Sequence, residues 1–191
     1  MGDITNPKQL STLTLGDQGS SADVLANPRL FVWNAARHLL FTPMTLMTNA
    51  KDAKEPYRNS DAWQGTVAIS IDTTKGIHEE SRITHLDRSG LEAKRAEECK
   101  QYTVVDQKPV CQKLIGGGEY CSVPSQGYVP PYCYVSSPIG EYFASQLWNF
   151  SNDFVLRNLY LGSNLVTVSN NRLQINDIDS GYIKTGGVVL Q

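Results

Sequence analysis

Residues 155–190 read VLRNLYLGSNLVTVSNNRLQINDIDSGYIKTGGVVL, and this stretch decides the fold. It divides into four short segments in which apolar and polar residues alternate, as expected of half-buried strands. The breaks between the segments are rich in Asn, Gly and Ser, which tight hairpin turns require. We therefore predict four consecutive antiparallel strands: Val155–Leu161, Leu165–Ser169, Arg172–Ile178 and Tyr182–Leu190.

A second set of four strands is predicted nearer the N-terminus. Its clearest member places Val67, Ile69 and Ile71 on one face and small or polar residues on the other. Charged residues in the last strand suit an outermost position that must resist pairing with other chains. The predicted strands are Leu30–Trp33, Leu39–Met47, Trp63–Asp72 and Ile77–Leu86.

Two sets of four short strands match the blades of a β-propeller, in which each antiparallel sheet buries its faces against its neighbours. We predict an all-β fold of such blades, and a β-sandwich, which uses about seven to nine short strands, is the alternative. Residues 1–15 are assigned to the last strand of a preceding blade, 16–86 to a complete blade, 87–153 to an irregular insertion and 154–191 to the C-terminal blade. Because two blades cannot close a ring, we expect missing N-terminal blades of the same protein as partners.

The composition fits a soluble globular protein without a basic surface for nucleic acid. Hydrophobic residues make up 40% of the 191 residues, and 17 basic against 19 acidic residues give a formal net charge of -2. No stretch approaches the roughly 18 apolar residues that span a bilayer, so no transmembrane segment is predicted. The N-terminus lacks the apolar core of a signal peptide, and we expect an export signal upstream of this sequence.

All four cysteines, Cys99, Cys111, Cys121 and Cys133, fall within the predicted insertion. Their segment is rich in Gly, Pro and Tyr and offers little core of its own, so disulfides and an oxidising compartment are expected. Four cysteines allow three pairings, and the local one, Cys99 with Cys111 and Cys121 with Cys133, is the simplest. The alternatives are a zinc site, whose thiolates usually come as pairs about two to four residues apart, and free buried thiols.

An oxygen-rich loop with Asp17, Ser20, Ser21 and Asp23 is the candidate metal site. Ca²⁺, which prefers oxygen ligands, is the one cofactor considered, and the alternative is that these side chains cap turns. Together with Arg157, they would line a propeller channel. No G-x-S-x-G motif is present and the three histidines fall on scattered elements, so no catalytic residue is assigned.

Aromatic residues of the insertion are candidates for a recognition surface. Tyr and Trp supply rigid contact area with a polar group, which suits binding of protein or carbohydrate. The alternative is that these rings fold inward as a small core of the insertion. A short helix over residues 91–98, capped by Ser89, is predicted at its start. The candidate surface residues are Tyr120, Tyr128, Tyr132, Tyr134, Tyr142 and Trp148.

Several short motifs in both predicted blades carry a family resemblance through their shared order. They are Asp3–Pro7, Gly16–Ser21, Leu30–Trp33, Leu39–Phe41, Trp63–Gly65, Gly76–Ile77, Arg82–His85 and Arg157–Ser169. This order resembles a family of secreted bacterial and archaeal proteins with a C-terminal β-propeller domain. The chain departs from the family pattern at residues 27–29 and at Ser163, and the resemblance does not cover the insertion.

The resemblance implies export and an anchored or secreted propeller, without a defined enzymatic activity. We therefore expect an extracellular or cell-surface scaffold that binds a protein or glycan ligand, with no nucleic-acid partner. One alternative is a hydrolase-like enzyme with its active site in the propeller channel. The other is a purely structural surface module.

Overall fold

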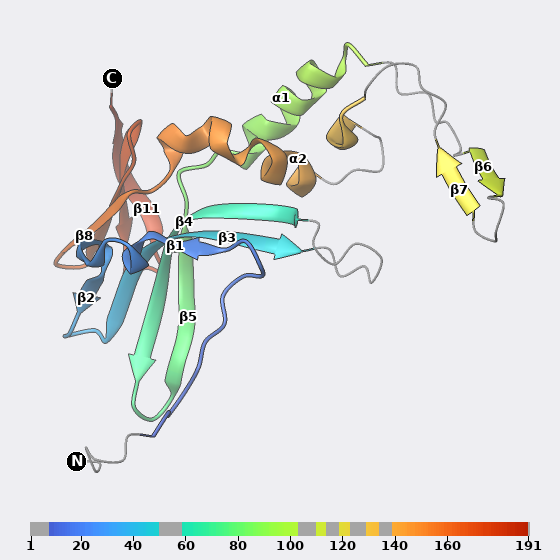
Figure 1. The fold of residues 1–191 in the computed structure, drawn as a ribbon. Coiled ribbons are helices and arrows are strands. Elements are labelled where there is room, and N and C mark those ends of the chain that lie inside the picture. The colour runs from blue at the N-terminus through green and yellow to red at the C-terminus, as the bar shows by residue number, and fades with distance from the viewer. Residues whose placement is uncertain are drawn as a thin grey trace.

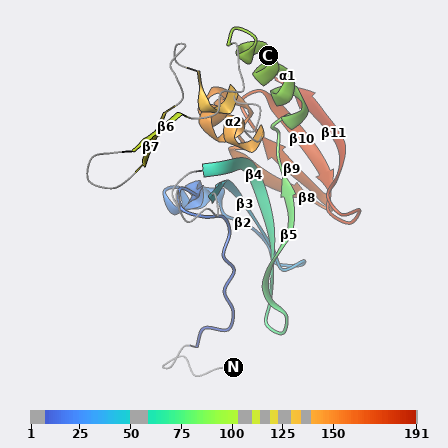
Figure 2. The ribbon, with the colours of Figure 1, turned by 90° about the vertical axis from the view of Figure 1, so that its right-hand side faces the viewer.

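The computed structural model describes residues 8–49, 59–102, 110–113, 119–122, 129–133 and 139–190. Two antiparallel sheets form the body of the molecule (Figure 1). The helices of the insertion lie at one end of these sheets, and the N-terminal segment runs to the opposite end (Figure 1, Figure 2). No helix within the described ranges combines the length and apolar character that a bilayer crossing needs.

The first sheet confirms the predicted N-terminal set of strands. Its order is β1-β3-β4-β5, and β2 pairs with β3 beside β1. The predicted strand Leu30–Trp33 is shorter than expected, because Pro28–Leu30 form a 3-10 turn, η2, before it; η1 covers Asp23–Leu25. The strands are β1 (Ser21–Ala22), β2 (Val32–Asn34), β3 (Leu39–Asn49), β4 (Asn59–Asp72) and β5 (Gly76–Ile83).

The turn between β4 and β5 is held by one carboxylate. Asp72 Oδ1 accepts hydrogen bonds from the backbone N–H groups of Thr74 and Lys75, at 2.7 and 2.8 Å. The hydroxyl of Thr74, together with these N–H groups, lowers the pKa of Asp72 to about 2. Gly76 ends the turn with a φ of +84°, a conformation that residues with a Cβ adopt rarely.

The second sheet is the predicted C-terminal meander, with strand order β11-β10-β9-β8. A two-residue turn joins β8 to β9, and its first residue, Gly162, has a φ of +61°. A positive φ at this position is what a type II′ hairpin turn requires. The strands are β8 (Arg157–Leu161), β9 (Asn164–Val168), β10 (Arg172–Asp177) and β11 (Ile183–Val189), each within two residues of the predicted bounds.

Residues 8–15, where a strand was predicted, form no strand. They run across the outer side of the first sheet, where Ser11 Oγ accepts a 3.2 Å hydrogen bond from the N–H of Ile77. Leu13 and Leu15 pack against a buried cluster that includes Val67. Alternation alone does not make a strand, because a strand needs a paired neighbour, and this segment has none among the residues described. Its assignment to a preceding blade stays a prediction.

The two sheets pack face to face around a shared core. Leu39 and Phe41 of β3 and Ala68 of β4 meet Leu165 of β9 and Ile178 after β10. All five side chains are at most 8% exposed. Both sheets thus bury one face in the same interior, as neighbouring propeller blades do.

The insertion contains more regular structure than predicted. Its first helix begins one residue before Ser89, and the cap is Asp87, whose side chain accepts a hydrogen bond from the N–H of Ser89. A carboxylate suits this position because it accepts a hydrogen bond from a free N–H group and because its negative charge interacts favourably with the positive end of the helix dipole. The elements are α1 (Arg88–Cys99), β6 (Val110–Lys113), β7 (Glu119–Ser122), η3 (Pro131–Cys133), α2 (Ile139–Gln146) and η4 (Leu147–Asp153).

Candidate functional site

Buried polar groups connect the two sheets. The side-chain amide of Gln64 on β4 donates to the carbonyl of Val155 at 3.0 Å and accepts from its N–H at 2.8 Å. On the same strand, Thr66 Oγ1 donates to Oδ1 of Asn158 on β8 at 2.5 Å. These hydrogen bonds favour one relative position of the two sheets, because sliding one sheet over the other would leave buried polar groups unpaired.

We call this interface between the two sheets the joint. Of the three histidines, His85, just after β5, is the one buried in it. Its side chain is 2% exposed, and Nε2 is hydrogen-bonded to Oγ1 of Thr167 at 2.8 Å. Nδ1 has no hydrogen-bond partner among the described residues. Burial, with a further contribution from Arg172 and Lys184 against an opposing one from Asp153, lowers the pKa of His85 to about 4. The ring is therefore neutral at pH 7 and holds the joint as a polar contact.

The other two histidines occupy separate places. His38 lies in the turn between β2 and β3 with a φ of +56°, and its ring is 6.3 Å from that of Trp33. His78 on β5 is exposed and lies 2.8 Å from a carboxylate oxygen of Glu80. The structure thus distributes the three imidazoles over different elements, as the sequence predicted.

The oxygen-rich loop is hydrogen-bonded to the end of β3. Asp17 donates its N–H to the carbonyl of Met47 at 2.8 Å, and its Oδ2 accepts from the N–H of Asn49 at 3.0 Å. Ser20 Oγ accepts from the N–H of Met47 at 2.9 Å. Ser21 begins β1 and Asp23 begins η1. This is the turn-capping role that the sequence left as the alternative to Ca²⁺.

Within the described ranges, no three His, Cys, Asp or Glu side chains gather so that they could hold an ion. Arg157, the fifth predicted channel residue, begins β8 in the second sheet, whereas the loop residues border the first sheet. Ca²⁺ binding stays a prediction, and the loop residues have a structural task that explains them.

The predicted recognition surface divides into buried and exposed aromatic residues. Tyr142 is 1% exposed and packs with Phe143 and Leu147 on Leu86 and Leu91, so its assignment to a surface is wrong. Burial and a hydrogen bond with Glu98 raise its pKa to about 12. The physical reason is that α2 packs on β4 and also on α1, so that Tyr142 and Phe143, about 100° apart around the helix, are both covered.

Of the other candidates whose side chains the structure describes, one is open to solvent. Tyr132 is half-buried, with its ring 5.0 Å from that of Tyr142. Trp148 is 74% exposed. Tyr128, Tyr134 and the side chain of Tyr120 lie outside the described residues.

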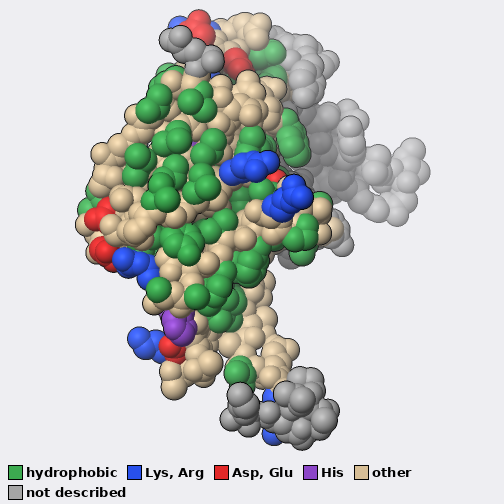
Figure 3. All heavy atoms as spheres, turned by 90° about the vertical axis from the view of Figure 1, so that its left-hand side faces the viewer, with side chains coloured by type: hydrophobic (Ala, Val, Ile, Leu, Met, Phe, Trp, Pro, Cys, Tyr) green, Lys and Arg blue, Asp and Glu red, His purple; other side chains and the backbone are tan. Residues whose placement is uncertain are grey.

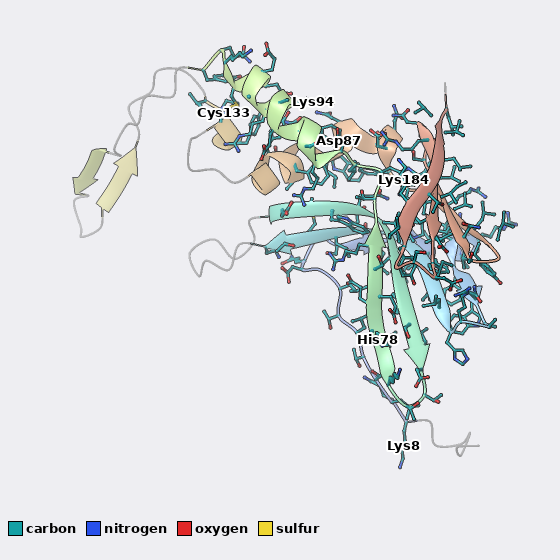
Figure 4. The ribbon with its side chains drawn as sticks, turned by 180° about the vertical axis from the view of Figure 1, so that it is seen from behind. Lys8, His78, Asp87, Lys94, Cys133 and Lys184 are labelled. Atoms are coloured by element: carbon teal, nitrogen blue, oxygen red, sulfur yellow. A yellow bond between two sulfur atoms is a disulfide. The ribbon has the colours of Figure 1, made fainter. Side chains whose placement is uncertain are left out.

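A disulfide joins the end of α1 to η3. It links Cys99 to Cys133, which are 34 residues apart, so the local pairing, the simplest of the three, is wrong. The helix α2 packs on α1, which ends at Cys99, and on η3, which contains Cys133, and spacing along the chain does not reveal this arrangement. Figure 4 shows Cys133 beside the end of α1 that lies away from Asp87. Cys111 and Cys121 lie opposite each other in the register of β6 and β7.

The second sheet has one aliphatic face that the first sheet does not cover, and the sequence analysis did not identify it. Leu165, Thr167 and Ile178 lie on the covered face. On the side of the molecule where β8 lies, hydrophobic side chains gather over the surface (Figure 3). The register assigns eight aliphatic residues to this side, which we call the open face: Leu159, Leu161, Val166, Val168, Leu173, Ile175, Ile183 and Val188.

Comparison with known proteins gives one match. A family model described as the beta propeller domain matches residues 1–117, which include the first sheet and α1. No curated protein and no solved structure matches the chain. With two antiparallel sheets packed face to face, this match confirms the all-β, propeller-type fold class, in the form of a partial propeller. Propellers are a kind of fold suited to protein-interaction scaffolds, because a rigid ring of sheets carries variable loops.

Proposed function

Because this chain belongs to the beta propeller domain family, we propose that it is part of an extracellular or cell-surface scaffold that binds a protein or glycan through its insertion. The sheets supply rigidity, and the insertion supplies the recognition surface. No catalytic step is assigned to it. The observation that carries the proposal is that the insertion is packed onto the sheet and still presents an exposed Trp148.

The helices of the insertion are anchored to the first sheet. Phe143 and Leu147 are at most 1% exposed and pack in one cluster with Ala62 of β4 and Leu91 of α1. The disulfide adds a covalent link across α1 and η3. A binding surface on such a support loses little conformational entropy when a ligand binds.

Trp148 has the surroundings of a ligand contact. Its ring lies 6.0 Å from that of Phe154, which supports one side of the indole. The neighbouring Asn149 donates a side-chain hydrogen bond to Gln146, so two amide groups lie one and two positions away along the chain. An exposed indole next to amides suits a sugar ring or a protein loop, since both offer apolar and polar contacts together.

The disulfide also supports the proposed location outside the cytoplasm. Structural disulfides form and persist in oxidising compartments and are rare in reducing ones. An export signal upstream of this sequence is part of the proposal.

The test uses the oxidised 191-residue protein and its Trp148→Ala variant. Both are screened against a glycan array and against surface proteins of the producing cell, and hits are measured by calorimetry. We expect the variant to bind at least about tenfold more weakly, the effect of removing a central Trp contact. Trp33→Ala, at a 37% exposed Trp on β2, is the control and should bind normally. Equal binding by the Trp148 variant would contradict the proposal.

A further inference from the structure

Two cationic side chains share a small cavity at the outer edge of the second sheet. The register places Arg172 of β10 and Lys184 of the edge strand β11 on the same face as Thr167, opposite to the open face. This face turns toward the first sheet, but its outer edge is in contact with solvent: the side chain of Arg172 is 34% exposed, and Lys184 is exposed. Both residues line one cavity of about 130 Å³.

A glycine leaves room for the lysine to reach this cavity. A Cβ added at Gly187 of β11 would lie 3.7 Å from Cε of Lys184, so the lysine side chain runs along the strand from position 184 toward position 187. Val189, two residues further, pairs with Arg172. The two cations therefore meet at one cavity, although Lys184 itself pairs with Asn176, four positions away from Arg172.

Both cations have hydrogen-bond donors that the described residues do not use. Nε of Arg172 is buried and has no hydrogen-bond partner among the described residues. A buried N–H group without an acceptor is costly, so such a group beside a cavity indicates that something in the cavity accepts from it. None of the ion pairs between described residues involves Lys184.

Carboxylates of the insertion balance only part of this positive charge. Oδ1 of Asp153 lies 3.4 Å from a terminal nitrogen of Arg172, a long distance for a charged hydrogen bond. Asp87 is also within electrostatic reach of Arg172, but its carboxylate caps α1 and accepts hydrogen bonds from Ser89. The charge of Lys184 has no such counterpart among the ion pairs of the described residues, so the cavity keeps a positive charge.

The positive potential of the two cations extends into the joint. Burial is the main cause of the low pKa of His85, and Arg172 and Lys184 lower that pKa further, against the opposite effect of Asp153. Charges that act on a buried ring in this way act also on a group that enters the cavity between them, because electrostatic interactions are strong away from bulk water. The cavity therefore favours an anion over a neutral group.

We propose that this cavity binds one tetrahedral oxyanion group, a sulfate or a phosphate carried by a ligand. The oxygens of such a group accept charge-assisted hydrogen bonds from Nε of Arg172 and from the ammonium group of Lys184 at the same time. Pockets that enclose a whole drug-sized ligand measure about 300–1,000 Å³. A cavity of about 130 Å³ holds one functional group, and the rest of the ligand lies outside it. The proposal does not depend on ligand binding at Trp148.

The experiment titrates the ¹⁵N-labelled, oxidised 191-residue protein with sodium sulfate and, separately, with sodium phosphate at pH 7. Sodium chloride at equal ionic strength is the reference. We expect the backbone N–H signals of Arg172, Lys184 and Gly187 to shift and saturate with a dissociation constant in about the millimolar range, as befits a single group. Saturation by both anions assigns the site to either group, and saturation by one identifies which group it prefers.

Two variants and one control locate the site. Lys184→Gln, at an exposed position, should raise the dissociation constant at least about fivefold, because it removes a charged donor. Arg172→Lys keeps the charge but loses the Nε donor, and should also weaken binding. Lys75→Gln, at an exposed lysine between β4 and β5, is the matched control and should bind normally.

Three results would overturn the proposal. One is that neither anion shifts these signals more than chloride does at concentrations up to about 50 mM. Another is an unchanged dissociation constant in Lys184→Gln, which tests the site even if the Arg172 variant fails to fold. The third is that shifts of equal size appear at lysines and arginines outside the cavity, because the anions would then bind to basic side chains in general.

Discussion

Protonation of His85 should weaken the joint between the sheets, and the structure gives the magnitude. Burial lowers its pKa from 6.5 to about 4, so below pH 6.5 the unfolded chain binds a proton that the folded chain does not. The contribution of His85 is therefore present above pH 6.5 and is lost as the pH falls toward 4. The difference between the two pKa values corresponds to about 3 kcal/mol in the free energy of unfolding, of which about 2 kcal/mol is lost between pH 7 and pH 4.5.

Urea denaturation at pH 7, 6, 5 and 4.5, followed by tryptophan fluorescence, measures this loss. His85→Gln keeps a polar group near Thr167 and removes the titration, so its free energy of unfolding should fall less over this range. His78→Gln, at an exposed position, is the control and should follow the wild type. Parallel curves for the wild type and the His85 variant would refute the reasoning, because carboxylates alone would then explain the pH dependence.

Three further predictions concern Gln64, the disulfide and Gly65. Gln64→Ala should lower the free energy of unfolding by about 2–4 kcal/mol in urea denaturation, because it leaves the N–H and carbonyl of Val155 buried and unpaired. Peptide mapping of the oxidised protein should recover Cys99 linked to Cys133, and replacing both by Ser should cost about 4 kcal/mol in the loop-entropy model for a 34-residue separation. Gly65→Ala should prevent stable folding, measured by circular dichroism, because its Cβ would lie 2.2 Å from a backbone oxygen of β5; normal folding would show that the strands can separate there.

The strands were predictable from the sequence because their signals are local. The alternation of Val67, Ile69 and Ile71 and the Gly-Ser turn at Gly162 each depend on a few neighbouring residues. The failed strand in residues 8–15 shows the limit of this reasoning. Its alternation is just as regular, but a strand also needs a partner, and pairing is a property of the whole fold.

The insertion was less predictable because long-range contacts organise it. Tyr142 was a candidate surface residue in the sequence, and the packing of α2 on β4 and on α1 buries it. Packing of α2 on both α1 and η3 accompanies the pairing of Cys99 with Cys133, which no spacing rule selects among the three possible pairings. Asp87 was missed as a helix cap because Ser89 offered a competing cap two residues later.

The open face escaped sequence reasoning because alternation assigns residues to faces, and it does not say what covers each face. One signal was nevertheless present in β9. Leu165 and Thr167 point to the first sheet, while Val166 and Val168 point away from it, so the strand is apolar on both sides. Such continuous apolar runs are typical of sheets covered on both faces. In this structure the first sheet covers one of these faces; on the other face Val166 is 8% exposed, whereas Leu159 and Leu161 of the neighbouring β8 are 54% and 70% exposed.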